Sequence, residues 1–377
     1  MHIGRREGCK ILFVKINILA SHRFHLLDLA RELSRLGHDV RFYSYVPTQR
    51  CAEFGIDQSL CVSFLWLVWP FFALAKIAPK GWQESIVWHR NLLIDWYVSQ
   101  TMRKCDVCMG IGTVYVKAFE TAKQNGATAI LEWGSKHIEE QIKQFGKVDS
   151  YSSRTMQREL RQYDVCDYIS IPATHVKDSF LKHGIPASKL IVNPYGVDLS
   201  QFHPTSCSYE YDLIYVGGWR YEKGCDLLID LCQRYGYKLL HVGALVNLDF
   251  PKMSTMTHHE PVDQNELVNY YAKARVFVLP SRAEGLSLVQ AQAIACGLPV
   301  VCSKETGGAD LRDQLTDKKW IIEMEDLSVE ALLDAVDKGL NLARTQKGIR
   351  NYTGDDMNRL SWENYGTRYS EKLTRIR

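Results

Sequence analysis

Short apolar runs separated by helix-length polar stretches recur along most of the chain. The first apolar run lies at Lys10 to Ile16, and leucine and alanine side chains then repeat at helical spacing between residues 26 and 36. Gly37 is placed to end this helix, because glycine accepts the left-handed backbone that often follows a last helical turn. A second apolar run, VRFYSY, follows at residues 40–45. The pattern predicts a β-α-β unit near the start of the chain.

The same alternation continues in two series of apolar runs. The first series comprises residues 106–110, 129–131, 168–171 and 190–192, and the second comprises residues 212–216, 239–242, 276–279 and 299–302. Strands that alternate with helices predict parallel, doubly wound sheets. Such sheets bind ligands beyond the carboxyl ends of their strands, so two facing domains would enclose a cleft for two substrates.

The segment between the two series, NPYGVD, contains Pro194 and Gly196, which are typical of a connection between domains. We therefore predict an α/β fold with two facing Rossmann-like domains. Residues 1–195 form the N-terminal, acceptor-side domain, and residues 196–358 form the C-terminal domain. Residues 359–377 form a C-terminal helix, for which packing back on the N-terminal domain is one arrangement.

Residues 62–78, VSFLWLVWPFFALAKIA, do not follow the alternating pattern. The segment has one charged residue, Lys76, several aromatic side chains, and Pro70 near its middle. It is shorter than the roughly 20 apolar residues that a membrane-spanning helix needs. Two interpretations stay open: a buried helix pair or flap over the acceptor site, or peripheral contact with the inner face of a membrane.

Charge and cysteine content exclude some classes of protein. The chain has 46 Lys and Arg against 43 Asp and Glu, a formal net charge of +3, which argues against a nucleic-acid partner. Its 11 cysteines lack paired spacing, and no signal peptide is recognisable at the N-terminus, so we predict reduced thiols and a cytoplasmic protein. Cys105 and Cys108 form a C-x-x-C without a second Cys or His pair at zinc spacing, so we predict no metal site.

A glycine turn with two cations follows the strand predicted at residues 212–216. Gly217 and Gly218 let an anion approach the backbone closely. Arg220 and Lys223 come just before the next predicted helix, where their charges and the helix dipole would act together on phosphate oxygens. The turn has neither a Walker G-K-[ST] nor a full G-x-G-x-x-G. Phosphate binding and a merely solvated turn are both open on this pattern.

A second set of candidate ligands follows the strand predicted at residues 276–279. Glu284 and Gly285 lie in the next loop, where the Glu284 carboxylate could accept hydrogen bonds from sugar hydroxyls. The following residues are predicted to form the first helical turn, with amides available to a diphosphate: Leu286, Ser287 and Leu288. Gln292 lies on that helix. The alternative is that Glu284 only caps the helix and Gln292 faces solvent.

Together these segments resemble glycosyltransferase family 4, the retaining enzymes of GT-B fold. The family pattern is a strand, then G-R-x-x-x-x-K-G, then E-x7-E, then A-x-x-x-G-x-P-V-V. In this chain YVGGWRYEKG at residues 215–224 and EGLSLVQAQAIACGLPVV at residues 284–301 fill those places. The resemblance spans nearly the whole chain and is strongest from residue 194 to 308. It implies the GT-B fold, with the donor diphosphate bound in the C-terminal domain.

The motifs depart from the family in two places. The family's diphosphate-binding arginine falls on Gly218, and Arg220 is the nearest candidate, whereas Lys223 matches directly. The second Glu of E-x7-E, which in the family binds ribose hydroxyls, is Gln292 here, and an amide can still accept a hydrogen bond from a hydroxyl. The resemblance places Glu284 beside the transferred sugar.

The acceptor side is predicted at ILEWGSKHIEEQ, residues 130–141, which follows a strand and so opens into the cleft. It is similar to E-x-G-S-x-H segments in a subset of the family, which makes Glu132 and His137 candidates for the acceptor or catalytic loop. His137 is equally compatible with an exposed histidine at a helix start. His25 matches a position that the family often fills with histidine.

The resemblance implies transfer, with retention, of a sugar from a nucleotide-sugar donor to a glycan or lipid-linked sugar acceptor in polysaccharide or glycoconjugate synthesis. The nucleotide-diphosphate sugar is a substrate, and the family needs neither a cofactor nor a divalent metal. Lys223, Arg220 and helix-end amides would stabilise the leaving diphosphate. Two other functions stay open: a sugar-nucleotide epimerase of GT-B fold, and a non-catalytic homologue that binds a nucleotide sugar or glycan.

Overall fold

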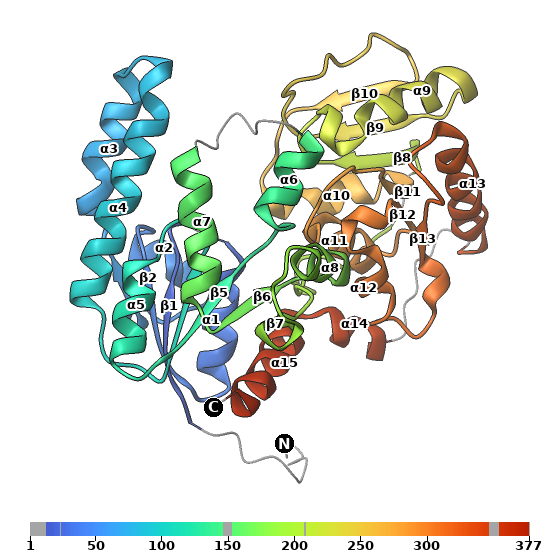
Figure 1. The fold of residues 1–377 in the computed structure, drawn as a ribbon. Helices are drawn as coiled ribbons and strands as arrows, with labels where there is room; N and C mark the ends of the chain where they lie inside the picture. Colours follow the sequence, from blue (N-terminus) through green and yellow to red (C-terminus); the bar gives the residue numbers. More distant parts are fainter. Residues whose placement is uncertain (1–12, 23, 146–152, 207–208, 347–353, 377) are drawn as a thin grey trace.

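Two parallel sheets, one in each half of the chain, organise the structure (Figure 1). The computed structural model describes residues 13–22, 24–145, 153–206, 209–346 and 354–376. Helices connect most successive strands within each sheet, and the two sheets belong to separate halves that face each other across a cleft. The predicted α/β fold with two Rossmann-like, doubly wound domains is confirmed.

The N-terminal sheet has seven strands in the order β3-β2-β1-β4-β5-β6-β7. The strands are β1 (Lys15–Leu19), β2 (Asp39–Ser44), β3 (Cys61–Ser63), β4 (Val107–Ile111), β5 (Thr128–Glu132), β6 (Tyr168–Ile171) and β7 (Leu190–Val192). Its helices include α1 (His25–Arg35), α2 (Thr48–Glu53), α5 (Lys117–Gln124), α6 (Ile138–Phe145), α7 (Ser153–Val165) and α8 (Thr174–Lys182). Successive side chains alternate between the faces of a strand, so Ile18 packs in one apolar cluster with α1 while Leu19 packs in another with α5.

The first strand differs from its predicted bounds. It was expected over residues 10–16, of which 10–12 lie outside the described residues, and it continues to Leu19. Residues 17–19, which follow the predicted strand, are held in β1 because it lies between two partner strands. Asn17 is paired with Arg41 on β2 and with Cys108 on β4.

The C-terminal sheet has six strands in the order β10-β9-β8-β11-β12-β13. The strands are β8 (Tyr211–Val216), β9 (Leu239–Val242), β10 (Met256–His259), β11 (Ala274–Leu279), β12 (Val300–Cys302) and β13 (Ile321–Glu323). Its helices are α9 (Cys225–Tyr235), α10 (Leu267–Tyr271), α11 (Leu288–Ala295), α12 (Gly308–Arg312) and α13 (Val329–Thr345). The central strand β11 is buried from Val276 to Leu279, as expected for a parallel strand covered on both faces.

The end of the chain returns to the N-terminal half. After α14 (Gly354–Leu360), helix α15 (Trp362–Arg375) packs against α1, and His38 Nε2 lies 2.8 Å from Ser370 Oγ. At the crossing, a Cβ atom on Gly196 would lie 2.6 Å from the Trp362 backbone, so a side chain there would collide. The C-terminal helix is therefore part of the N-terminal half in space.

The apolar segment 62–78 contains the first helix of a helical hairpin. Its first helix, α3 (Leu65–Ile77), is followed by α4 (Gln83–Thr101), which packs against α5, and the pair projects at one end of the molecule (Figure 1). Val68 is the buried residue of α3, whereas Trp66 and Trp69 are 65% and 64% exposed. A helix pair does form, but its outer face is not buried, contrary to the first interpretation. Among the described residues, no helix combines the length and apolar character needed to cross a bilayer.

Candidate active site

A cavity of about 520 Å³, here called the first cavity, lies between the two halves. Loops that follow β5, β8 and β11 supply most of its walls, so it sits at the carboxyl ends of both sheets. The N-terminal half contributes Phe24, Gly134, Ser135, Lys136, Gln141 and Tyr195, and the C-terminal half contributes Arg220, Glu222, Lys223 and residues 283–289. The predicted glycine turn and the predicted Glu284 loop thus meet at one site.

The turn after β8 depends on glycine. Gly217 has φ +144°, a backbone conformation that side chains rarely allow, and Gly224 has φ +71° at the start of α9. A Cβ atom on Gly224 would lie 2.0 Å from the Pro280 carbonyl oxygen. Between them, residues 221–223 form a short 3₁₀ helix that carries Lys223 into the cavity wall. The glycines therefore bring two loops of one sheet edge close enough to share a ligand.

Arg220 lies in the cavity wall with part of its guanidinium unsatisfied. Its Nε atom is buried and donates to no protein acceptor in the described structure. A buried guanidinium N–H without an acceptor is costly unless a ligand supplies one. An anion in the first cavity would supply this acceptor once the guanidinium turns Nε toward it.

Lys223 and Glu284 form an ion pair between the two loops. The side chains are 26% and 13% exposed, so both remain accessible from the cavity. Glu284 is therefore paired with Lys223, while the residue at the start of α11 is Ser287, whose side chain makes no capping bond. The alternative role of Glu284 as a helix cap is wrong.

Helix α11 begins later than predicted. It starts at Leu288, so Leu286 and Ser287 precede the helix and Leu288 opens it. All three residues line the first cavity with Gly285. Because no side chain caps α11, its first-turn amides keep donors that an anion can use.

Gln292 lies one turn further along α11 and is 7% exposed. Its Oε1 atom accepts a hydrogen bond from the Tyr271 hydroxyl at 3.1 Å. The alternative that Gln292 faces solvent is wrong, because the side chain is buried against α10. Gln292 is not among the residues that line the first cavity.

The two halves touch where their loops enter the cavity. A Cβ atom on Gly285 would lie 1.7 Å from the Gly134 carbonyl oxygen, so the two backbones are in direct contact. His175 Nε2 lies 2.9 Å from the Glu284 carbonyl oxygen, and Gln144 donates to the Arg282 carbonyl oxygen at 2.6 Å. The structure therefore has a closed arrangement at this edge.

Glu132 does not reach the first cavity. It is 2% exposed, its Oε2 atom lies 3.0 Å from His25 Nε2, and it accepts a hydrogen bond from the Tyr369 hydroxyl on α15. The carboxylate therefore orients His25, whose other ring nitrogen, Nδ1, is buried without a hydrogen-bond partner in the described structure. The sequence identified both residues but not that one supports the other.

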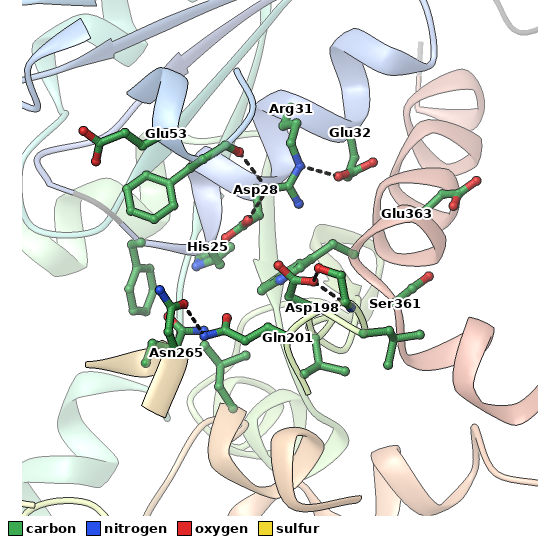
Figure 2. A pocket seen from close by; sticks show the side chains of 18 of the residues that line it. His25, Asp28, Arg31, Glu32, Glu53, Asp198, Gln201, Asn265, Ser361 and Glu363 are labelled. Atoms are coloured by element: carbon green, nitrogen blue, oxygen red, sulfur yellow. Dashed lines mark hydrogen bonds and ion pairs between the residues drawn. The ribbon is translucent and has the colours of Figure 1, made fainter. Parts of the chain in front are cut away.

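His25 instead lines a second cavity of about 930 Å³ (Figure 2). Charged side chains of α1 and α2 form one wall, and segments 198–201, 263–265 and 361–363 form the rest. Arg31 is held by an ion pair to Asp28 at 2.7 Å, as the dashed lines in Figure 2 show. Phe24 and Leu288 line both cavities, which makes the two spaces neighbours. A polar cavity of this kind suits hydroxyl-rich ligands.

His137 is also buried, contrary to the interpretation as an exposed helix-start histidine. It is 2% exposed, and its Nδ1 atom lies 3.3 Å from the Glu139 amide. Burial, followed by repulsion from His183, lowers the pKa of His137 to about 4, so the ring is neutral at pH 7. His137 is not among the residues that line either cavity.

His137, Glu139 and His183 place potential ligand atoms within 4.8 Å of one another. The two imidazole rings stack 4.3 Å apart with planes only 7° from parallel. Stacked parallel rings hold their in-plane lone pairs in two separate parallel planes, whereas two ligands of one ion must point at the same position. This geometry does not suit a shared metal without rotation of a ring.

Sequence reasoning missed some residues that line the first cavity. Tyr195 contributes a ring whose hydroxyl is buried without a hydrogen-bond partner in the described structure, and burial raises its pKa. Lys136 forms an ion pair with Glu305 from the other half. Tyr195 lies in the predicted connection between the domains and Lys136 in the predicted acceptor-side segment, and their place in those segments was the available signal.

Comparison with known proteins supports the motifs and the fold. Residues 210–341 match the family model described as glycosyl transferases group 1. The chain is 25% identical over 241 residues to the O-antigen chain mannosyltransferase RfbU of Salmonella typhimurium, an alignment that covers 58% of this chain and 65% of the relative. It is 29% identical over 101 residues to an uncharacterised glycosyltransferase of Methanocaldococcus jannaschii, over 25% of this chain and 29% of the relative. The aligned segments span less than two thirds of either relative.

The fold is shared over almost the whole chain. The structure of Anabaena HepE in complex with UDP and glucose superposes with a TM-score of 0.63 and 14% sequence identity, covering 96% of this chain and 99% of HepE. The predicted GT-B fold is thereby confirmed. Residues 210–341, which carry Arg220, Lys223 and Glu284, match the glycosyl transferases group 1 family on a GT-B fold that extends through the rest of the chain.

Proposed function

We propose that the chain is a retaining, metal-independent glycosyltransferase that moves a sugar from a nucleotide-sugar donor to a glycan or lipid-linked acceptor, in polysaccharide or glycoconjugate synthesis. The observation that carries the proposal is the first cavity. There the Arg220 side chain, the ammonium of Lys223 and the uncapped start of α11 line one space. Three cationic or N–H donor groups around one space suit a diphosphate.

The donor diphosphate would take the place of Glu284 as the partner of Lys223. The freed carboxylate could then accept hydrogen bonds from hydroxyls of the transferred sugar, whose ring would lie beside Gly285. Arg220 would bind the phosphates on the other side of the turn. Gly217 and Gly218 do not line the first cavity, but as the turn that leads to Arg220 they would let the diphosphate approach the backbone. Gln292, which also lies outside the lining, is the candidate for the ribose.

In the proposed reaction, the bond between the anomeric carbon and the diphosphate oxygen breaks, and its electron pair stays on the diphosphate. The acceptor hydroxyl oxygen forms the new bond on the same face of the sugar, and its proton goes to a diphosphate oxygen. The enzyme's main task is therefore to stabilise charge on the leaving group. Neither step calls for a base held by the protein or for a metal.

The acceptor would enter from the second cavity, which adjoins the first at Phe24 and Leu288. His25, oriented by Glu132, would contact the substrates at that junction. In this proposal Glu132 is a positioning residue, because it acts through His25. His137 would support the loop from behind, since its ring is buried among Tyr163, Phe180 and His183.

A screen of nucleotide sugars by thermal shift tests the proposal first, because a ligand that binds only the folded state raises the melting temperature. A donor found in this way should release its nucleotide only when an acceptor is present. NMR of the product should show the donor's anomeric configuration, and EDTA should not lower the rate. Isomerisation of the donor sugar without acceptor would instead indicate an epimerase, and binding without turnover would indicate a non-catalytic homologue.

A further inference from the structure

The α3–α4 hairpin has an apolar outer face that the described part of the chain leaves uncovered. Eight of the sixteen large apolar side chains that are exposed among the described residues belong to the hairpin, including Trp66, Trp69, Trp82 and Trp96. Helix α3 is apolar on all sides, a composition expected for a helix surrounded by apolar material. The described residues cover only one side of it, so the other side is open to a partner.

The inner face shows that the hairpin is nevertheless firmly built. Phe64 and Val68 are fully buried, and the Phe72 ring packs 5.3 Å from that of Tyr45. The Gln83 side chain donates to the Ala75 carbonyl oxygen at 2.7 Å and so ties the turn. At the other end, Asp95 accepts hydrogen bonds from three amides at the start of α5. The exposed face is therefore presented by a fixed element.

Charge on the hairpin favours an anionic partner. From Gln58 to Gln83 the sequence has two lysines, Lys76 and Lys80, and no Asp or Glu. The acidic residues of α3 and α4 are Glu84 and Asp95, and each is paired with an arginine of α7. The outer face thus combines tryptophan with unopposed positive charge, the combination that lies at the interface of anionic bilayers.

The length of α3 sets the depth of contact. Its 13 residues extend about 20 Å, less than the roughly 30 Å of hydrocarbon in a bilayer. The aromatic rings would therefore sit at headgroup depth and the helix would not cross. Trp and Tyr rings prefer this zone because it solvates their apolar and polar parts at once.

We propose that the outer face of the α3–α4 hairpin docks on the surface of an anionic lipid bilayer. Helix α3 follows the carboxyl end of β3, and the acceptor-side loops follow the carboxyl ends of β1 and β5 in the same parallel sheet. Docking would hold that edge beside the lipid. This inference rests on the proposed function in one respect: with a glycosyltransferase cleft at the edge, it selects a lipid-linked acceptor over a free glycan.

Vesicle co-sedimentation tests the docking directly, with phosphatidylcholine vesicles alone or mixed with phosphatidylglycerol. The wild-type chain should bind the mixed vesicles. Replacing both Trp69 and Trp82 by Ser should weaken binding at least about tenfold, since the interfacial area lost is largely aromatic. The melting temperature should stay within about 2 °C of the wild type, because both side chains point outward. Tyr235→Ser, on the exposed end of α9, is the matched control and should bind as the wild type does.

Reversing the charge of the hairpin lysines measures the electrostatic contribution to vesicle binding. Lys76→Glu with Lys80→Glu should weaken binding to the mixed vesicles by more than about 20-fold, from roughly fivefold per lysine. Lys104→Glu with Lys252→Glu makes the same change in net charge at exposed positions outside the hairpin and should have a small effect. High salt should weaken wild-type binding in the same direction.

Absence of binding to either vesicle type, or binding that the tryptophan pair does not affect, would overturn the proposal. So would a dimer of the wild-type chain that the tryptophan pair dissociates, since a second copy would then cover the face. None of these readouts requires turnover. Donor binding, followed by thermal shift on the same variants, should be unchanged, which keeps failure of docking distinct from failure of the proposed enzymatic function.

Discussion

Lys223 and Glu284 form an ion pair across the first cavity, although 61 residues separate them in the chain. The pair joins the glycine turn after β8 to the loop after β11, so two separate motifs of the sequence form one electrostatic unit. Without a ligand, each charge balances the other. A diphosphate would draw Lys223 toward itself and free the Glu284 carboxylate for sugar hydroxyls.

We predict that Lys223→Ala lowers kcat/KM at least about 100-fold, because a charged contact to a developing diphosphate contributes about 3 kcal/mol to the transition state. Steady-state kinetics with the identified donor measure the effect. Lys338→Ala is the control, since Lys338 is 63% exposed and pairs with Asp334 on α13, outside the cavity. Near-wild-type turnover in Lys223→Ala would remove the phosphate assignment.

Arg220→Gln should weaken binding of the free nucleoside diphosphate by about 10- to 100-fold, since a hydrogen bond to a charged group contributes about 1.5–3 kcal/mol. Arg220→Lys should recover only part of the loss, because lysine lacks the planar fork of donors that the guanidinium offers to phosphate. Titration calorimetry gives both dissociation constants. Equal constants for Arg220→Gln and the wild type would show that the unpartnered Nε meets no phosphate.

Gln292→Glu should leave donor affinity unchanged or increase it, because a carboxylate oxygen can still accept the Tyr271 hydrogen bond and can also accept from a ribose hydroxyl. Gln292→Leu removes that acceptor and should lower the free energy of unfolding by about 1–3 kcal/mol. Donor titrations and thermal melts of both variants separate the two effects. A large loss of donor affinity in Gln292→Glu would place the ribose elsewhere.

His25 and Glu132 should behave as one unit in catalysis. His25→Gln and Glu132→Gln are each expected to lower kcat/KM, and the double variant should be little worse than the more affected single variant. Groups that contact each other usually show interaction energies of about 0.5–3 kcal/mol in such a cycle. Additive losses would mean that Glu132 does not act through His25.

The buried His137 predicts a specific pH dependence of stability. Its pKa is about 4 in the folded chain, below the value of about 6.5 expected when unfolded, so the unfolded chain binds the extra proton first. The contribution to stability is complete above about pH 6.5 and is lost as the pH falls toward 4. Chemical denaturation across this range should show a shallower pH dependence for His137→Gln than for the wild type. An NMR titration that places the pKa of His137 near 6.5 would contradict the prediction.

The strands that the sequence did not predict share one physical property. β3, β10 and β13 lie at edges of the two sheets, and β3 and β13 have three residues each. An edge strand has a partner strand on one side only and is less completely buried than a central strand. Its sequence therefore needs no continuous apolar run, as the MTHH of β10 illustrates. The central strands are buried on both faces, so each has a continuous apolar run from which it could be predicted.

The site was predictable where its residues lie within one motif, and not where packing brings distant elements together. Arg220, Lys223, Gly285 and Ser287 were predicted and line the first cavity. The contact of Glu132 with Tyr369 joins residues 237 positions apart through the packing of α15. No local pattern encodes such a contact, and the same is true of the burial of His137 beside His183.

The return of α15 to the N-terminal half gives the molecule two crossings between its halves, which lie side by side. Val197 on the first crossing is bridged to Ser361 on the second, and Gly196 fits tightly against Trp362. Two adjacent covalent connections define one rotation axis between the halves, whereas a single connection would allow rotation in any direction. Relative motion of the halves should therefore be confined to rotation about that axis, which parts Gly134 from Gly285 while the crossings hold still. Substrate would be admitted by a swing in one direction, and small-angle scattering with and without nucleotide should detect it as a single change in radius of gyration.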